Sequence, residues 1–198
     1  MWKDQSGNTF EGEYVSQTLL TVVLRDRTGK TVRLPISKLS DADQKFLTTS
    51  IPPKLEIDFS KNQDRRNSYW GTYSDVSMVC KIIINKVSYP VYTGRLSVTL
   101  VIIGKNDRTR KYLILDKAQE EFDFVDAKSF SLRGKHFNMR QSNSSDDVTK
   151  YIGFLAVVTD KTGAVIAIKS NRKEFLSEKD LLLKAKKGNA FDRNFEKE

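Results

Sequence analysis

The chain has 198 residues, of which 38% are hydrophobic and 30% are charged, a composition that suits one or two folded domains. No apolar run approaches the roughly 18 residues that a membrane-spanning helix needs, so we expect no transmembrane segment in this chain. The formal net charge is +9, but residues 1–50 carry seven Lys and Arg against six Asp and Glu. The positive excess therefore lies beyond this near-neutral N-terminal part.

Residues 1–50 have the pattern of short strands and turns. Asn8–Val15 alternates in the way of a half-buried strand, and Leu19–Arg25 and Thr31–Pro35 form a predicted hairpin around Gly29, which supplies a positive φ. Ser40 followed by Asp43 is a variant of the helix capping box. We expect a three- or four-stranded barrel that is closed at one end by a short helix.

The order of these elements resembles a known family. The motifs that carry the resemblance are Trp2-x-Asp-x-x-Gly7, Phe10-x-Gly-Glu-Tyr-Val15, Val22-x-Leu24, Gly29-Lys-x-Val-x-Leu-Pro35 and Lys38-Leu-Ser-x-x-Asp-x-x-Phe-Leu47. They are similar to the Sla-one homology domain one, which implies an SH3-like barrel. Bacterial members of that family occur in uncharacterised exported proteins, so the resemblance also implies a place in the bacterial cell envelope or at the cell surface. Fungal members of that family bind a short peptide with an asparagine-proline-phenylalanine core and an acidic residue, and a basic residue before the turn glycine contributes to the site. The corresponding stretch here is Arg25–Gly29, where Asp26 falls nearest that position and Arg25 and Arg27 flank it.

Residues 51–198 are expected to form a second β domain, after a linker near Thr48–Pro53. The expected strands are 55–59, 75–85, 89–104, 111–115, 121–125, 129–139, 151–159 and 164–170, with a bend at 116–120, a patternless polar segment at 61–68 and a polar loop at 141–147. Short strands separated by turn signals indicate an immunoglobulin-like β-sandwich. We expect a short helix within Glu178–Lys187 and a frayed chain end beyond Gly188.

The residues offer little for catalysis. His136 is the only histidine and Cys80 the only cysteine, so a Cys-His or Ser-His-Asp site would have to use His136, and the usual structural zinc sites are excluded. Cys80 stands among apolar residues and is expected to be a buried hydrophobe. Phosphate-binding and dinucleotide-binding glycine motifs are missing. We therefore predict a protein that is not an enzyme and that has no metal and no cofactor.

The function that we expect is protein or peptide binding, with self-association as a further possibility, through the barrel or through edge strands of the sandwich. The candidate peptide-binding residues are Trp2, Phe10, Tyr14, Arg25, Arg27, Lys30 and Arg33. The chain opens directly on domain sequence, so we expect that a leader has been removed and that the protein is periplasmic or extracellular, with a cytoplasmic location left open.

Two other classes of function stay open. The main alternative is single-stranded nucleic-acid binding, in which aromatic side chains stack on bases and basic loops contact phosphates. Its candidate residues are Trp2, Tyr14, Trp70, Tyr73, Arg65, Arg66, Arg108 and Arg110. The near-neutral charge of residues 1–50 argues against nucleic acid as the main partner. A hydrolase that uses two unrecognised carboxylates is the third class.

Overall fold

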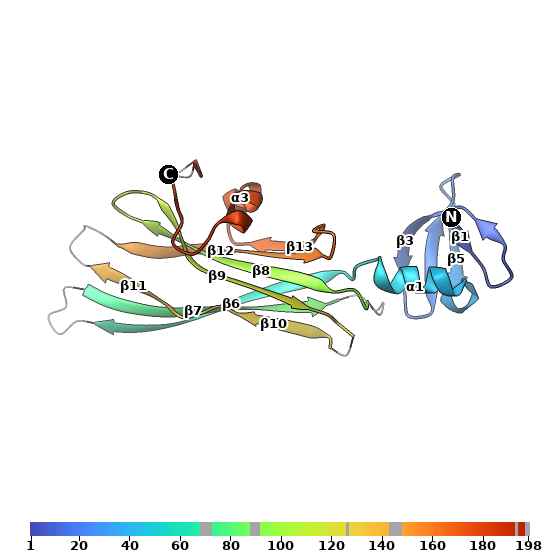
Figure 1. The fold of residues 1–198 in the computed structure, drawn as a ribbon, viewed down its shortest axis with the longest axis horizontal. Helices are drawn as coiled ribbons and strands as arrows, with labels where there is room; N and C mark the ends of the chain where they lie inside the picture. Colours follow the sequence, from blue (N-terminus) through green and yellow to red (C-terminus); the bar gives the residue numbers. More distant parts are fainter. Residues whose placement is uncertain (68–72, 88–91, 126, 143–147, 193, 197–198) are drawn as a thin grey trace.

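The computed structural model of the chain describes residues 1–67, 73–87, 92–125, 127–142, 148–192 and 194–196. Within these residues the fold is mainly β, as predicted, with four sheets and three short α-helices. Two bodies are visible in Figure 1, a small N-terminal unit and a long two-layered unit. None of the helices in the described part of the chain is long and apolar enough to cross a membrane.

The N-terminal unit contains two small sheets and one helix. Strand β1 pairs with β2, and β3, β4 and β5 form a three-stranded antiparallel sheet. Their bounds are β1 Trp2–Lys3, β2 Thr9–Phe10, β3 Glu13–Gln17, β4 Thr21–Arg25, β5 Thr31–Pro35, the 3-10 turn η1 Ile36–Lys38 and α1 Asp41–Thr49.

Local sequence explains most of this unit. The predicted hairpin forms with Leu24 opposite Val32, and Gly29 has a φ of +84° at its turn. Helix α1 begins after Ser40, whose hydroxyl accepts the Asp43 amide at 3.3 Å, so the predicted cap is confirmed. A small core holds the unit together, made of Trp2, Val22, Leu24, Leu39 and Leu47.

Two sheets make up the long unit. One has β7 at its centre, with β6 on one side and β10 followed by β11 on the other. The other has the order β13-β12-β8-β9-β14. The bounds are β6 Leu55–Asn67, β7 Tyr73–Lys86, β8 Leu96–Asn106, β9 Tyr112–Phe122, β10 Ser129–Arg133, β11 Phe137–Ser142, β12 Thr149–Asp160, β13 Val165–Ser170 and β14 Ala190–Phe191.

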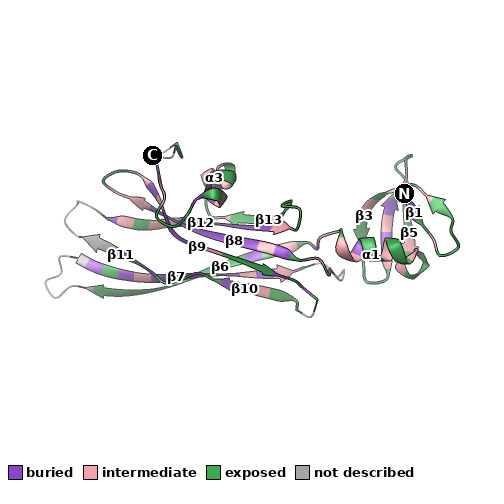
Figure 2. Cartoon of the chain, viewed as in Figure 1, coloured by how far each residue is buried: buried purple, intermediate pink, exposed green. Residues whose placement is uncertain are grey.

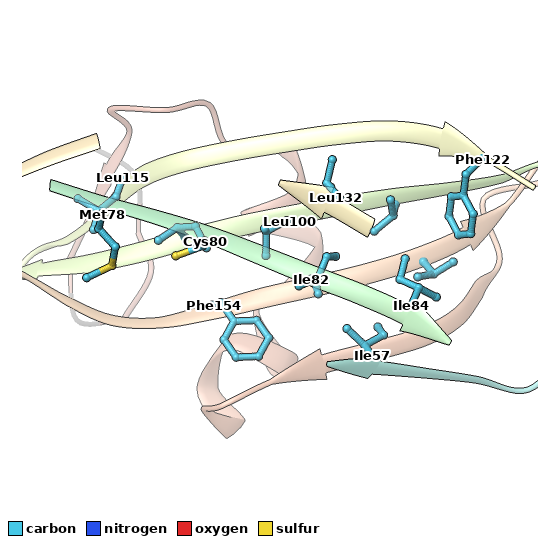
Figure 3. Packing of buried hydrophobic residues seen from close by; sticks show 14 of the residues in the cluster. Ile57, Met78, Cys80, Ile82, Ile84, Leu100, Leu115, Phe122, Leu132 and Phe154 are labelled. Atoms are coloured by element: carbon cyan, nitrogen blue, oxygen red, sulfur yellow. The ribbon is translucent and has the colours of Figure 1, made fainter. Parts of the chain in front are cut away.

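The main core lies between the two sheets. Alternate residues of β7 face inward, and Figure 3 shows Met78, Cys80, Ile82 and Ile84 directed toward side chains of the other layer such as Leu100. All five of these residues are at most 2% exposed. Each Å² of apolar area that is buried contributes about 25 cal/mol, so this core is the main source of stability for the long unit.

A second core covers the opposite face of the larger sheet. Helices α2 (Lys173–Ser177) and α3 (Lys179–Lys184) lie on this face, and Phe175, Leu182, Phe191 and Phe195 are all buried there. Burial on both faces explains why β8 is buried from Leu100 to Gly104 and β12 from Gly153 to Val158 (Figure 2). The expectation that the chain frays beyond Gly188 is therefore wrong, because Phe191 and Phe195 fold back onto the sheet.

Four strand predictions differ from the structure. Residues 92–95 of the predicted strand 89–104 lie outside β8, which begins at Leu96. Strand β6 continues through the polar segment to Asn67, because its backbone pairs with β7 along its whole length. Strand β9 is continuous where a bend was expected, with a register shift opposite Ile102 and Ile103. The predicted strand 129–139 is instead broken between β10 and β11, at residues 134–136.

A buried carboxylate holds that break in place. The Gly134 amide donates to the Cys80 carbonyl oxygen at 2.9 Å, and the Lys135 amide donates to Oδ2 of Asp116 at 2.9 Å. Asp116 is only 2% exposed. This hydrogen bond is partly buried, and an amide that is withdrawn from water needs such an acceptor, so the Asp116 side chain of β9 supports the break.

Candidate functional site

An apolar groove lies on the surface of the N-terminal unit. Its volume is about 620 Å³, and its floor is formed by Phe10, Leu24, Val32, Leu34 and Leu39. The cross-strand pair Leu24 and Val32 places two of these side chains on one face of the β4–β5 hairpin. Val32 is 40% exposed although it is hydrophobic, so a ligand in the groove would remove it from water.

Two turns contribute carboxylates to the groove rim, one from Asp4 and one from Asp26. At one turn, Oδ1 of Asp4 accepts the Asn8 amide at 2.8 Å and its Oδ2 accepts the Asn8 side-chain amide at 3.0 Å. At the other, Oδ1 of Asp26 accepts the Thr28 amide at 2.8 Å and the Lys30 amide at 2.9 Å. Both carboxylates are therefore fixed in position by their own loops.

Hydrogen bonding also sets the charge of these rim residues. The Asn8 side chain, as the largest cause, holds the pKa of Asp4 below the usual carboxyl value. The Thr28 side chain does the same for the pKa of Asp26. Hydrogen bonds to the ionised form favour that form, so both residues are anionic at neutral pH.

The seven residues that the sequence predicted for peptide binding are distributed over different environments. Only Phe10 lines the apolar groove. Trp2 is 5% exposed, and its indole nitrogen donates to the Gly12 carbonyl oxygen at 2.9 Å. Tyr14 packs half-buried against the core, and burial raises its pKa. These two aromatic residues therefore contribute to the core of the unit.

The predicted basic residues lie outside the groove. Arg25 and Arg27 line a neighbouring polar hollow of about 540 Å³, and Arg27 forms an ion pair with Glu11. Lys30 and Arg33 are exposed and line neither hollow. Sequence reasoning missed the floor residues Leu24, Val32, Leu34 and Leu39. The available signal was the alternation that places Val32 and Leu34 on one face of the second hairpin strand.

The residues considered for catalysis are not assembled into a site. Cys80 is 0% exposed in the main core, and burial, with a smaller contribution from the Asp116 charge, raises the pKa of its thiol to about 12. Its thiol is therefore protonated at neutral pH. His136 is exposed, in the break between β10 and β11. Among the described residues, no three His, Cys, Asp or Glu side chains are grouped to hold a metal ion.

The residues of the nucleic-acid alternative are also separated. Trp2 is buried, so its ring face is not available for a base to stack on. Trp70 lies outside the described residues, as do 143–147 of the predicted polar loop. Arg65 and Arg66 are exposed on β6, and Arg108 and Arg110 are exposed in the turn between β8 and β9. Of the aromatic candidates with a described side chain, only Tyr14 is partly exposed.

Comparisons with known proteins add little to this geometry. No family model and no curated relative matches the chain. A solved structure from Akkermansia muciniphila is similar over 63% of this chain and 74% of its own length, with 17% identity and a TM-score of 0.27. A target of the Northeast Structural Genomics Consortium is similar over 61% of this chain and 88% of its own, with 8% identity and a TM-score of 0.29.

Proposed function

We propose that the protein is a non-enzymatic protein-binding or assembly module of the bacterial cell envelope or surface. In this proposal the N-terminal unit is an SH3-like barrel of the Sla-homology type, and it holds a peptide segment of a partner in the apolar groove. The groove itself is the observation that carries the proposal, since its volume of about 620 Å³ lies in the range of known ligand pockets. The envelope location rests on the resemblance of residues 1–50.

We also propose that residues 51–198 form an immunoglobulin-like sandwich. The order of the strands supports this. Counted within the long unit, the first, second and fifth strands (β6, β7 and the interrupted β10–β11) share one sheet, and the third, fourth, sixth and seventh (β8, β9, β12 and β13) share the other. Apart from the short additional strand β14, the constant-type immunoglobulin arrangement differs in placing the fourth strand with the first, second and fifth.

Edge strands are a weaker candidate for the binding surface than the groove. On the edge of β6, Nζ of Lys169 donates to the Ile57 carbonyl oxygen and lies 3.9 Å from Oδ1 of Asp58. A lysine that occupies an edge carbonyl hinders the pairing of another strand there. At one end of β9, the short strand β14 occupies the edge beside Tyr112 and Leu113. The groove has no such cover among the described residues.

A pair of matched variants tests the proposal. Val32→Glu places a charge on the groove floor, whereas Val15→Glu changes a valine of the same 40% exposure outside the groove. Peptides selected from a random phage-displayed library on the full chain should bind the wild type and Val15→Glu equally. Their affinity for Val32→Glu should fall by at least about tenfold, because burying an unpaired charge costs several times RT.

Two outcomes would contradict the proposal. The first is a library that yields no peptide with a preference for the folded chain over the same chain unfolded in urea. The second is an equal loss of affinity in both variants, which would place the binding surface outside the groove. Circular dichroism of each variant shows that a loss of binding is not a loss of folding.

A further inference from the structure

The charged residues of the groove rim have mainly one sign. Asp4, Glu11 and Asp26 contribute three carboxylates, and Lys38 contributes one ammonium group. The peptide ligand that the family resemblance implies carries an acidic residue. The carboxylate of such a ligand would lie beside a rim of the same charge, and this repulsion lowers the affinity.

The neighbouring arginines only partly offset these carboxylates. Arg25 and Arg27 line the adjacent polar hollow together with Glu11 and Asp26, and the guanidinium of Arg27 pairs with Glu11. Asp4 and Asp26 form no ion pair among the described residues, and their carboxylates accept hydrogen bonds from Asn8, Thr28 and the Lys30 amide. The charge of Lys30 also acts on Asp26, as the smallest of the causes that lower its pKa. Two anionic groups therefore face the groove on turns that hold them in place.

We propose that the groove accepts an extended peptide segment in which an apolar side chain is followed or preceded by Lys or Arg. The apolar side chain covers Val32, Phe10 and Leu34 on the floor, and the basic side chain lies beside Asp4 or Asp26 on the rim. This inference rests on the proposed function, because it specifies the partner for the same groove. It reverses the charge preference that the resemblance implies.

The direct test compares three synthetic peptide libraries on the full chain. All three share a degenerate hexapeptide core of Leu, Val, Pro and Phe, and they differ only in flanking residues, which are Lys and Arg, Gln, or Glu. Fluorescence anisotropy should give affinities in the order basic, neutral, acidic. The step from neutral to basic flanks should be about fivefold at low salt and should shrink at about 1 M salt, where the Debye length is about 3 Å.

Conservative variants link this preference to the rim. Asp4→Asn and Asp26→Asn remove the charge and keep a side-chain oxygen that can accept the turn amides. Combined, they should abolish the difference in affinity between the basic and the neutral flanks. Glu13→Gln is the matched control, because Glu13 is exposed and lines the polar hollow and not the groove; it should leave the preference intact.

The possible results separate this inference from the proposed function. Tighter binding of the acidic library would overturn the inference and leave peptide binding by the groove standing. A basic preference that survives in the Asp4→Asn, Asp26→Asn double variant would also overturn it. Binding of none of the three libraries, together with no peptide from the phage selection, would overturn the inference and the proposed function together.

Discussion

The break between β10 and β11 gives a stability prediction that follows from one contact. A Cβ atom added at Gly134 would lie 2.4 Å from Oδ2 of Asp116, while its next neighbour, the Cys80 carbonyl oxygen, is at 3.5 Å. In Gly134→Ala the carboxylate must therefore retreat by about 1 Å to reach an ordinary contact distance. That movement breaks its hydrogen bond with the Lys135 amide.

The expected cost combines two effects. Leaving the partly buried Lys135 amide without its acceptor costs about 1–3 kcal/mol, and the crowding of a packed interior costs about 1–3 kcal/mol. We therefore expect Gly134→Ala to lower the free energy of unfolding of the long unit by roughly 2–5 kcal/mol. Backbone strain adds nothing, because the φ of Gly134 lies outside the left-handed region.

A double-mutant cycle isolates the contact. Asp116→Ala alone should cost about 1–3 kcal/mol, because it removes the acceptor. In that background the added methyl group of Gly134→Ala has no carboxylate to displace. The second substitution should then be neutral or stabilising by about 0.4–1 kcal/mol. Urea unfolding followed by circular dichroism measures the four stabilities, and hydrogen exchange of the Lys135 amide reports the local opening.

The result that refutes this reasoning is additivity. If the two substitutions sum to within about 0.5 kcal/mol, the cost of Gly134→Ala does not come from Asp116. Unchanged protection of the Lys135 amide in Asp116→Ala would likewise show that the bond to the carboxylate does not hold the break in place.

Further predictions concern a thiol, a lysine and two turns. Cys80 should resist iodoacetamide at neutral pH and react once the chain is unfolded, because it is buried and its pKa is raised to about 12; labelling of the native chain by mass spectrometry would contradict this. Nζ of Lys117 donates to the carbonyl oxygens of Leu183 (2.5 Å) and Ala185 (2.9 Å), so Lys117→Met should lower the stability of the C-terminal cover by about 1.5 kcal/mol, seen as faster amide exchange in α3 with no change in α1. The pKa values of Asp26 and Asp160 are lowered, mainly by the hydroxyls of Thr28 and Thr162. The stability that each contributes is therefore complete above the ordinary carboxyl value of 3.8 and is lost as the pH falls through the lowered folded value. If the two units unfold independently, Asp26→Asn should reduce this acid loss in the N-terminal unit alone and Asp160→Asn in the long unit alone, as followed by NMR of the Gly29 and Gly163 amides.

Features set by neighbouring residues were predictable from the sequence. The helix cap at Ser40 and the turn at Gly29 depend on hydrogen bonds and φ angles within five residues, and both formed as expected. The inward alternation of β7 was also visible, because a strand with one buried face shows its period directly. In these cases the local chemistry and the final packing agree.

Features set by distant contacts were not predictable in the same way. The polar residues after Asp116 suggested a bend, but β9 stays extended because β8 pairs with it along its length. Phe191 and Phe195 are isolated apolar residues in a polar tail, and only the outer face of the larger sheet explains their burial. The groove belongs to this class as well: Trp2, Tyr14 and Phe10 look alike in sequence, and their different environments depend on which strand faces meet.

Two turns with the same chemistry show why the site needs the whole unit. Asp26-Arg-Thr-Gly29 and Asp160-Lys-Thr-Gly163 share the pattern Asp-x-Thr-Gly, and in both the Asp carboxylate accepts the amide of the Thr two residues later at 2.8 Å. Gly29 and Gly163 also have nearly the same φ, at +84° and +85°. Asp26 nevertheless lines an apolar groove, because its hairpin packs beside the Asp4 turn and Phe10, whereas Asp160 joins β12 to β13 at the end of the long unit. If binding of basic peptides depends on the charge at Asp26 and not on the charge at Asp160, recognition comes from the arrangement of the N-terminal unit and not from the turn motif. Asp160→Asn is therefore a second control for the rim variants, matched to Asp26→Asn in local hydrogen bonding and different only in its surroundings.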